Sequence, residues 1–323
     1  MLRKAGWEIS VMNKELLFFE PVFKTLVWGG NRMRDVYGYD IPSENTGECW
    51  AISAHPNGDC VCISQPFKGM TLSRIWNTYP EVFGNFGGDR FPLLLKVIDA
   101  ASDLSIQVHP DDHYARIHEN GSLGKTECWY ILECDENAKL VIGHNARSKE
   151  ELISMIDEGR FSELIREVPI KKGDFIQIDP GTVHAIKGGV MLLETQENSD
   201  VTYRLYDYDR LFEGKKRELH LAQSKEVITI PAKENAVVST SSDRPFEVLI
   251  ECDHYRVLKI NVKERATLED NASLRLVSCV EGEGSVNGIP IKKGQHFIVP
   301  KDYGELLFRG RMTLISSVPV AQR

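Results

Sequence analysis

Long apolar runs are missing from this chain of 323 residues. A helix that spans a bilayer needs roughly 18 or more consecutive apolar residues, and no run comes near that length. The start also lacks the basic stretch followed by an apolar stretch that is typical of a secretion signal. We therefore expect a protein with no membrane segment, in which residues 1–15 form an N-terminal tail.

Positive charge and paired cysteines are also scarce. The chain has 39 Lys and Arg against 47 Asp and Glu, a net charge of −8. This balance argues against nucleic acid or an anionic membrane as the main partner, although a small phosphorylated molecule needs only a few local cations. The seven cysteines are scattered and odd in number, without zinc-knuckle spacing. We expect reduced thiols and a cytoplasmic protein.

Short strand-like segments dominate what is present. Each is rich in β-branched or aromatic residues and is bounded by Gly, Pro, Asp or Asn, which favours a β-sandwich or barrel. Fewer segments favour a helix. The best of them opens with Ser148 and Glu151, which form a capping box, and is expected to reach about Arg166. The expected strands are 49–53, 59–63, 93–98, 128–132, 140–143 and 190–194, and the other expected helices are 72–76 and, more weakly, 216–227.

An internal repeat predicts two similar barrels. Residues 169–176 read PIKKGDFI and residues 290–297 read PIKKGQHF, and both copies continue through an apolar strand to a proline. His184 follows four residues after the proline of the first copy, where the second copy has Gly304. We therefore expect a metal site in the first barrel alone.

The join between the two barrels is predicted in the Ser-rich run 232–245, which has no strand periodicity. The expected domains are a metal-binding domain over residues 16–232, with helical insertions, and a second barrel over residues 245–323.

Four side chains are candidate metal ligands. Gln107 and His109 are two residues apart in a strand-like run, so their side chains lie on the same face. Glu127 follows a Gly-Lys-Thr segment, and His184 begins a strand after a Pro-Gly turn. One amide, two imidazoles and one carboxylate suit a borderline metal such as zinc, with room for a water or a substrate.

Several charged residues accompany these ligands. Lys96 lies in a strongly apolar strand, where an ammonium is costly unless it faces a polar cavity. Lys125 shares a face with Glu127, and Asp200 and Arg204 lie in one polar segment, where Arg204 could alternatively form a surface ion pair. A metal surrounded by cations suits an anionic, oxygen-rich substrate such as a sugar phosphate, and an aldose–ketose isomerisation through an enediolate fits this arrangement.

The chain resembles type I mannose-6-phosphate isomerases (phosphomannose isomerases). The resemblance extends from about residue 16 to the end and rests on several motifs in the family's order. These are SIQVHPDD at 105–112, GKTECWY at 124–130, PGTVHA at 180–185 and TYRLYD at 202–207, with FKTLVWGG at 23–30 and GECWAIS at 47–53. Longer members of the family carry an extra helical domain, so this chain looks like the compact bacterial form.

The resemblance implies an all-β chain of two cupin (jelly-roll) barrels with a few short surface helices. It also implies a zinc-dependent interconversion of mannose 6-phosphate and fructose 6-phosphate, with one zinc ion per chain. The residues carried over are Gln107, His109, Glu127 and His184 as zinc ligands, Arg204 as the active-site arginine, Lys125 as a phosphate-side cation, Asp200 and Lys96 as proton-transfer or orienting groups, and Glu48 and Tyr203 as substrate contacts.

Two other functions remain open at this point. Two histidines and a carboxylate also form the iron site of some cupin oxygenases. A cupin that binds a sugar phosphate without turnover is the non-enzymatic alternative. We expect a hexose 6-phosphate as the partner, no nucleic acid or membrane, and a monomer or weak homodimer.

Overall fold

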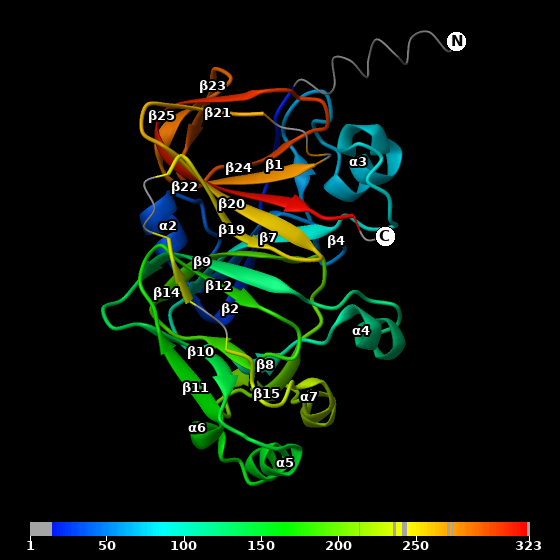
Figure 1. The fold of residues 1–323 in the computed structure, drawn as a ribbon, viewed down its shortest axis with the longest axis vertical. Coiled ribbons are helices and arrows are strands. Elements are labelled where there is room, and N and C mark those ends of the chain that lie inside the picture. The colour runs from blue at the N-terminus through cyan, green and yellow to red at the C-terminus, as the bar shows by residue number, and fades with distance from the viewer. Residues whose placement is uncertain are drawn as a thin grey trace.

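The structure, a computed structural model, describes residues 15–321 apart from 213, 235–236, 241–243, 270–271 and 273. Residues 1–14 of the expected tail therefore lie outside the described part. The described chain is mainly antiparallel β-sheet with a few short helices (Figure 1), as predicted. Five of the six expected strands are present, and the sixth, 59–63, is divided between two short strands of different sheets, Gly58–Asp59 and Val61–Cys62. No helix in these residues is long and apolar enough to cross a membrane.

The first barrel is formed by two sheets that face each other. Isoleucines from both sheets, including Ile98, Ile142 and Ile186, pack with Trp129 into the core between them. The larger sheet has the order β18 (Val237–Ser239), β12 (Asp174–Ile178), β9 (Glu127–Cys134), β14 (Val190–Glu197), β7 (Leu93–Ala100), β2 (Val22–Gly30) and β3 (Thr46–Ile52). The smaller sheet has the order β11 (Ile165–Pro169), β10 (Lys139–His144), β13 (His184–Ile186), β8 (Ile106–Val108) and β15 (Tyr203–Tyr206).

The second barrel packs on the outer face of the larger sheet. Its strands are β19 (Phe246–Glu251), β20 (Tyr255–Val262), β25 (Leu306–Pro319), β22 (Arg275–Val286) and β24 (His296–Val299), with β21 (Arg265–Leu268) and β23 (Ile289–Lys292) at the side. Two strands from early in the chain, β1 (Leu17–Glu20) and β6 (Val61–Cys62), extend this sheet, and Leu17 pairs with Ile298. One apolar cluster joins the barrels. Because the larger sheet is covered on both faces, β7 and β14 are buried along their whole length.

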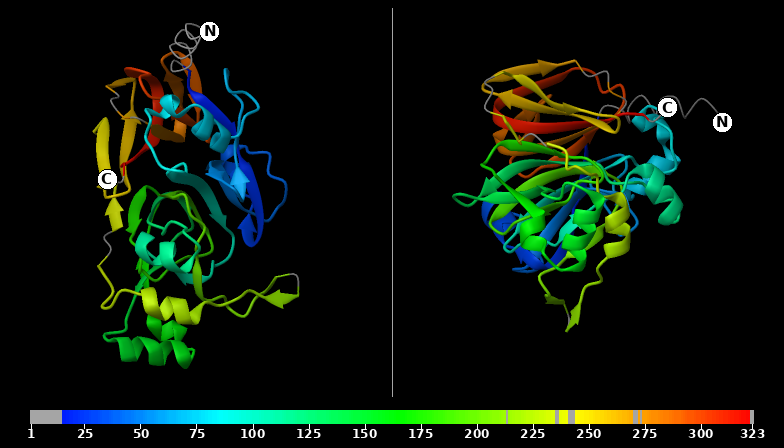
Figure 2. Two further views of the ribbon diagram at one scale, coloured as in Figure 1. Left: turned by 90° about the vertical axis from the view of Figure 1, so that its right-hand side faces the viewer. Right: turned by 60° about the horizontal axis from the view of Figure 1, so that its bottom comes forward.

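Short helices surround this β framework. The smaller sheet is covered on its outer face by α5 (Lys149–Asp157), α6 (Phe161–Leu164) and α7 (Leu221–Val227), which appear at the bottom of Figure 1. The remaining elements are α2 (Arg32–Tyr37), α3 (Leu72–Thr78), the 3-10 helix η1 (Pro80–Phe83), α4 (Asp112–His118), and the strand pairs β4 (Ala54–His55) with β5 (Gly58–Asp59) and β16 (Leu211–Phe212) with β17 (Lys215–Lys216). The β16–β17 hairpin projects from the body of the molecule (Figure 2).

Two expected helices are shorter than predicted. The cap at Ser148 is confirmed, since its hydroxyl accepts from the Glu151 amide at 3.2 Å, but the Glu151 carboxylate accepts from the amide of Arg147, at 2.7 Å, and not from that of Ser148. The helix ends at Asp157, not near Arg166, because the chain adopts the left-handed conformation at Gly159 (φ 67°). The candidate over 216–227 is helical only from Leu221.

The internal repeat is confirmed as a shared turn. Gly173 and Gly294 both have φ of 86°, a conformation that favours glycine. In both copies the side chain of the next residue accepts a hydrogen bond from the amide of the first lysine, at 2.9 Å from Asp174 and 2.8 Å from Gln295. The strand that follows pairs in its own barrel, as β12 with β9 and as β24 with β22.

Candidate active site

The four predicted ligands converge inside the first barrel. His184 pairs with Gln107 across β13 and β8, and Glu127 begins β9 on the facing sheet. The ligand atoms of His109, Glu127 and His184 lie within 4.8 Å of one another. The Gln107 amide is 3.2 Å from His184 Nε2, so all four side chains meet at one point.

Both imidazoles are held in one orientation by the backbone. His109 Nδ1 lies 2.8 Å from the Val201 carbonyl oxygen, and His184 Nδ1 lies 2.9 Å from that of Thr182. A carbonyl can only accept, so Nδ1 carries the proton and Nε2 keeps its lone pair toward the centre. Burial lowers the pKa of His184 to about 4 and holds the pKa of His109 well below its usual range. Neutral imidazoles with a free Nε2 are the form that binds a metal.

Glu127 completes a ligand set that fits a metal ion. Its side chain is fully buried, and neither carboxylate oxygen has a hydrogen bond of good geometry. Its Oε2 is instead 2.5 Å from Lys125 Nζ, which also lies 3.2 Å from His109 Nε2. A buried carboxylate requires a cation, and a divalent ion bound by these groups would compensate the charge that Lys125 now neutralises. The arrangement of this chain's own residues therefore fits the predicted metal.

A cavity of about 170 Å³ opens beside the ligands and is lined by many polar side chains. Lys96 and Glu194 form an ion pair of 3.3 Å on its floor, and both are almost completely buried. Burial raises the pKa of Glu194, but the charges of Lys125 and Lys96 outweigh it and lower that pKa to about 2. The lining residues are Leu26, Trp28, Glu48, Trp50, Lys96, Ile98, Leu104, Ser105, Gln107, Lys125, Ile186, Glu194, Asp200, Thr202, Arg204 and Arg217.

Two guanidinium groups mark one end of this cavity. Arg204 pairs with Gln107 across β15 and β8, and its Nε donates to Ser105 Oγ at 3.3 Å. Arg217 lies close enough that its charge, after burial, contributes to lowering the pKa of Arg204. Arg217 is itself held by Asp207, which accepts from Nε and Nη2 at 2.7 and 2.5 Å. Together, Arg204 and Arg217 form a surface that attracts anions at the end of the cavity near Ser105.

The structure brings most of the predicted site residues together. Lys96, Lys125, Asp200, Glu48 and Arg204 all line the cavity. Asp200 accepts from Asn57 Nδ2 at 2.6 Å, and Glu48 accepts from Trp50 Nε1 at 2.6 Å.

Tyr203 lies on the other face of its strand, away from the cavity. Its ring is 2% exposed within the core beneath the helices, and its hydroxyl donates to Glu119 at 2.7 Å. Side chains alternate along a strand, so Tyr203 and Arg204 cannot both face the cavity.

Sequence reasoning missed Glu194, Arg217 and Trp50. A carboxylate within the apolar strand 190–194 was the available signal for Glu194, of the same kind that identified Lys96. Arg217 follows a hairpin, and no local pattern connects it with residues of β8.

Comparisons with known proteins agree with this geometry. The family model for the catalytic domain of type I phosphomannose isomerase matches residues 16–133, and the model for the cupin domain of mannose-6-phosphate isomerase matches residues 247–319. A curated mannose-6-phosphate isomerase of Bacillus subtilis is 50% identical over 314 residues, which is 95% of this chain and 99% of that protein.

Solved structures show the same fold. A crystal structure of the Bacillus subtilis mannose 6-phosphate isomerase superposes with a TM-score of 0.90 at 46% identity and covers 94% of this chain and 99% of that one. A mannose 6-phosphate isomerase crystallised with zinc and yttrium has a TM-score of 0.76 at 16% identity, with 94% and 99% coverage. With half of its residues identical to a curated isomerase along nearly the whole length, this chain belongs to the type I mannose-6-phosphate isomerase family.

Proposed function

We propose that this isomerase interconverts mannose 6-phosphate and fructose 6-phosphate with one zinc ion held by Gln107, His109, Glu127 and His184. The observation that carries the proposal is the ligand cluster beside a cavity that Gln107 shares with four cationic side chains, Lys96, Lys125, Arg204 and Arg217. Zinc bound there would act as a Lewis acid that polarises a substrate oxygen. The chain's own side chains would stabilise the developing charge and orient the substrate.

The cavity gives the substrate a direction. Side chains at positions 105, 107 and 109 lie on one face of β8 and its extension, so Ser105 and His109 mark opposite ends. Arg204 contacts Ser105, whereas Lys125 contacts His109. We place the phosphate at the Arg204 and Arg217 end and the reacting carbons at the Lys125 end. The sequence had placed Lys125 on the phosphate side.

Charge stabilisation follows from this placement. Isomerisation moves a proton between neighbouring carbons and puts negative charge on an oxygen. Lys125 and Lys96 are buried ammonium groups in the cavity, and carboxylates raise the pKa of Lys125 although burial alone lowers it. Lys125 therefore stays charged. We assign Lys125, together with Lys96, which forms an ion pair with Glu194, to stabilising that oxygen.

Asp200 is assigned to orienting the substrate. Its hydrogen bond with His55 is the main cause of a pKa lowered to about 2, and such a carboxylate is a weak base. Glu194, with a pKa of about 2, is a similarly weak base, and we assign it to holding Lys96 in place.

Family membership and the residues that line the cavity argue against the two alternative functions. An iron oxygenase has no use for the paired guanidinium groups of Arg204 and Arg217 at the cavity end. A binding protein without turnover has no use for buried lysines beside the ligand cluster, since each ammonium is costly to bury.

The test is turnover of mannose 6-phosphate by the purified protein before chelation, after chelation, and after zinc or iron is added back. We expect chelation to abolish activity and zinc to restore it. Lack of activity in zinc-loaded protein would refute the proposed function. Restoration by iron alone would refute the choice of metal.

We further propose a cytoplasmic enzyme that is a monomer or weak homodimer, with a catalytic domain over residues 16–232 and a second barrel over residues 245–323. Three strands cross these bounds, because β1 and β6 extend the sheet of the second barrel and β18, from the predicted join, pairs in the first. All seven cysteines are free, and five of them are buried, as is typical of a reducing compartment.

A further inference from the structure

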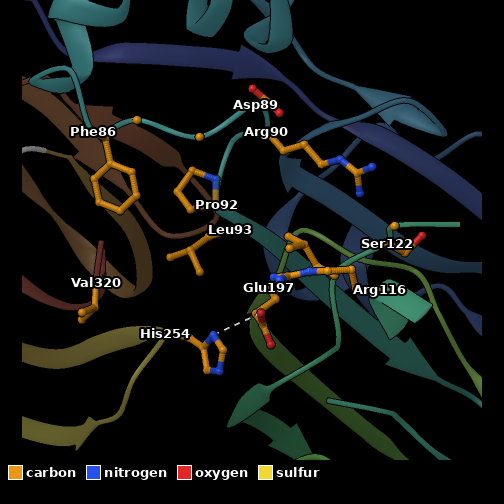
Figure 3. Close-up of a pocket in the computed structure, with 14 residues that line it drawn as sticks. Phe86, Asp89, Arg90, Pro92, Leu93, Arg116, Ser122, Glu197, His254 and Val320 are labelled. Atoms are coloured by element: carbon orange, nitrogen blue, oxygen red, sulfur yellow. Dashed lines mark ion pairs between the residues drawn. The ribbon is translucent and has the colours of Figure 1, made fainter. Parts of the chain in front are cut away.

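The second barrel reaches the catalytic strands through a turn between β19 and β20. His254 lies in this turn, and its backbone carbonyl accepts from the Val320 amide at 2.9 Å, so the end of β25 holds it in place. Its side chain points across the domain boundary to Glu197, the last residue of β14 (Figure 3). His254 Nδ1 and Glu197 Oε1 are 3.1 Å apart.

Glu197 in turn forms hydrogen bonds with both backbone groups of Thr126, its amide and its carbonyl. Its Oε2 accepts from the Thr126 amide at 2.7 Å, and its own amide donates to the Thr126 carbonyl at 3.0 Å. The carboxylate is 3% exposed, so these bonds are formed away from water. Thr126 lies between Lys125 and Glu127, whose side chains both point into the metal cluster.

The pair between the barrels is charge-assisted. Burial lowers the pKa of His254, but the bond to Glu197 and the nearby carboxylates of Asp112 and Asp253 outweigh burial and raise it. Hydrogen bonds with a charged partner are roughly twice as strong as neutral ones. His254, Glu197 and Asp112 also have the spacing of a metal site. Both oxygens of Glu197 already have protein partners, however, so the group is better explained as a clamp.

We propose that His254 is a positioning residue for the isomerisation and acts through Glu197 to fix the Thr126 peptide, and with it the side chains of Lys125 and Glu127. The expected effect on kcat rests on the proposed function, whereas the expected effect on the Thr126 peptide does not. It gives the barrel without a metal site a role in catalysis beyond packing. His254 contacts no substrate, because it lines a separate cavity of about 410 Å³ with Leu93, Arg116 and Val320.

The test compares His254→Ala with a matched control, Ser317→Ala. Ser317 Oγ is also hydrogen-bonded across the barrels, 3.0 Å from Thr195 Oγ1, but this contact ends on a side chain and does not reach the Thr126 peptide. We expect His254→Ala to lose more thermal stability than Ser317→Ala, because it removes a charge-assisted bond from a buried carboxylate, so both readouts are taken well below the melting temperature of each variant. A third variant, His254→Asn, keeps an amide N–H near the position of Nδ1 and should restore the clamp.

The first readout is hydrogen exchange of the Thr126 amide in the metal-loaded protein, which needs no catalytic activity. We expect exchange about tenfold faster in His254→Ala and unchanged in Ser317→Ala, because only the first variant loosens the acceptor of this amide. Equal exchange at Thr126 in both variants would overturn the proposal.

The second readout is the division of the effect between kcat and KM. Loss of a residue that hydrogen-bonds to a metal ligand typically lowers metal affinity or activity 10–100-fold. His254 lies one contact further out, so its loss should lower kcat about tenfold. We expect an unchanged KM, since Arg204 and Arg217 are not touched, and rescue of kcat by His254→Asn. An unchanged kcat in His254→Ala, or an equal loss in Ser317→Ala, would overturn the proposal. Lack of activity in the parent protein would instead refute the proposed function and leave the exchange result to decide the clamp.

Discussion

Arg217 and Arg210 provide an internally controlled test of the phosphate end of the cavity. Both guanidinium groups form ion pairs with the same oxygen of Asp207, at 2.5 and 2.6 Å, and their side chains are 23% and 20% exposed. Only Arg217 lines the cavity in the described structure. Replacing either with alanine removes one of the two guanidinium groups paired with Asp207, but only Arg217→Ala removes a group that faces the substrate.

The magnitude follows from the hydrogen bonds that Arg217 has already formed. Asp207 takes the N–H groups of Nε and one of Nη2, which leaves three of the five donors of the guanidinium for other acceptors. One charge-assisted hydrogen bond to a phosphate is worth about 2 kcal/mol. Its loss should lower kcat/KM for mannose 6-phosphate about 30-fold in Arg217→Ala, since 1.4 kcal/mol corresponds to about tenfold.

The assay is steady-state kinetics of the two variants with mannose 6-phosphate and with unphosphorylated mannose. Arg210→Ala should remain within about twofold of the parent with both sugars, because Arg210 does not line the cavity and Asp207 still holds Arg217. Arg217→Ala should be impaired with the phosphorylated sugar alone. Equal kcat/KM for mannose 6-phosphate in the two variants would refute the placement of the phosphate at this end.

Three further predictions concern the buried charges. Arg204→Ala should abolish turnover and keep bound zinc, whereas His184→Ala should lose both; equal zinc loss by metal analysis would contradict the assignment of Arg204 outside the ligand shell. Lys96→Met should cost about 3 kcal/mol at pH 7, because Glu194 is left buried without its ion-pair partner, and an unchanged urea midpoint would argue against the ion pair. The two lysines hold the pKa of Glu194 at about 2 against an ordinary value of 4.5, so this stabilisation is complete above about pH 4.5 and is lost as the pH falls toward 2. The deficit of Lys96→Met should shrink over the same range when measured by urea denaturation.

The sequence was sufficient for the features that depend on local patterns. Period-two alternation placed Gln107 and His109 on one face, and the Pro-Gly turn placed His184 at the start of a strand, as the structure has them. The repeat predicted two similar barrels, and its two copies share a turn in which Gly173 and Gly294 have the same φ of 86°.

Features that depend on distant pairing could not be predicted from such patterns. Arg217 reaches the cavity because Asp207 holds it there, and the two residues are ten positions apart with a hairpin between them. Alternation was misapplied in one place, since Tyr203 and Arg204 are neighbours and both were expected to serve the substrate. The end of the helix at Asp157 depends on the left-handed Gly159, which the apolar periodicity does not reveal.

The pairing of β1 with β24 is a contact between residues that are very far apart in the sequence. Leu17 and Ile298 are neighbours in one sheet although nearly the whole chain separates them. Closing so long a loop delays the contact, because its entropy cost has to be met before the pairing contributes any stability. During synthesis the edge of β1 that pairs with β24 therefore stays unpaired until the last strands of the second barrel have been made. The sheet of the second barrel is thus completed only when both ends of the chain are present, and a cut between the barrels would leave β1 and β24 with open edges prone to aggregation.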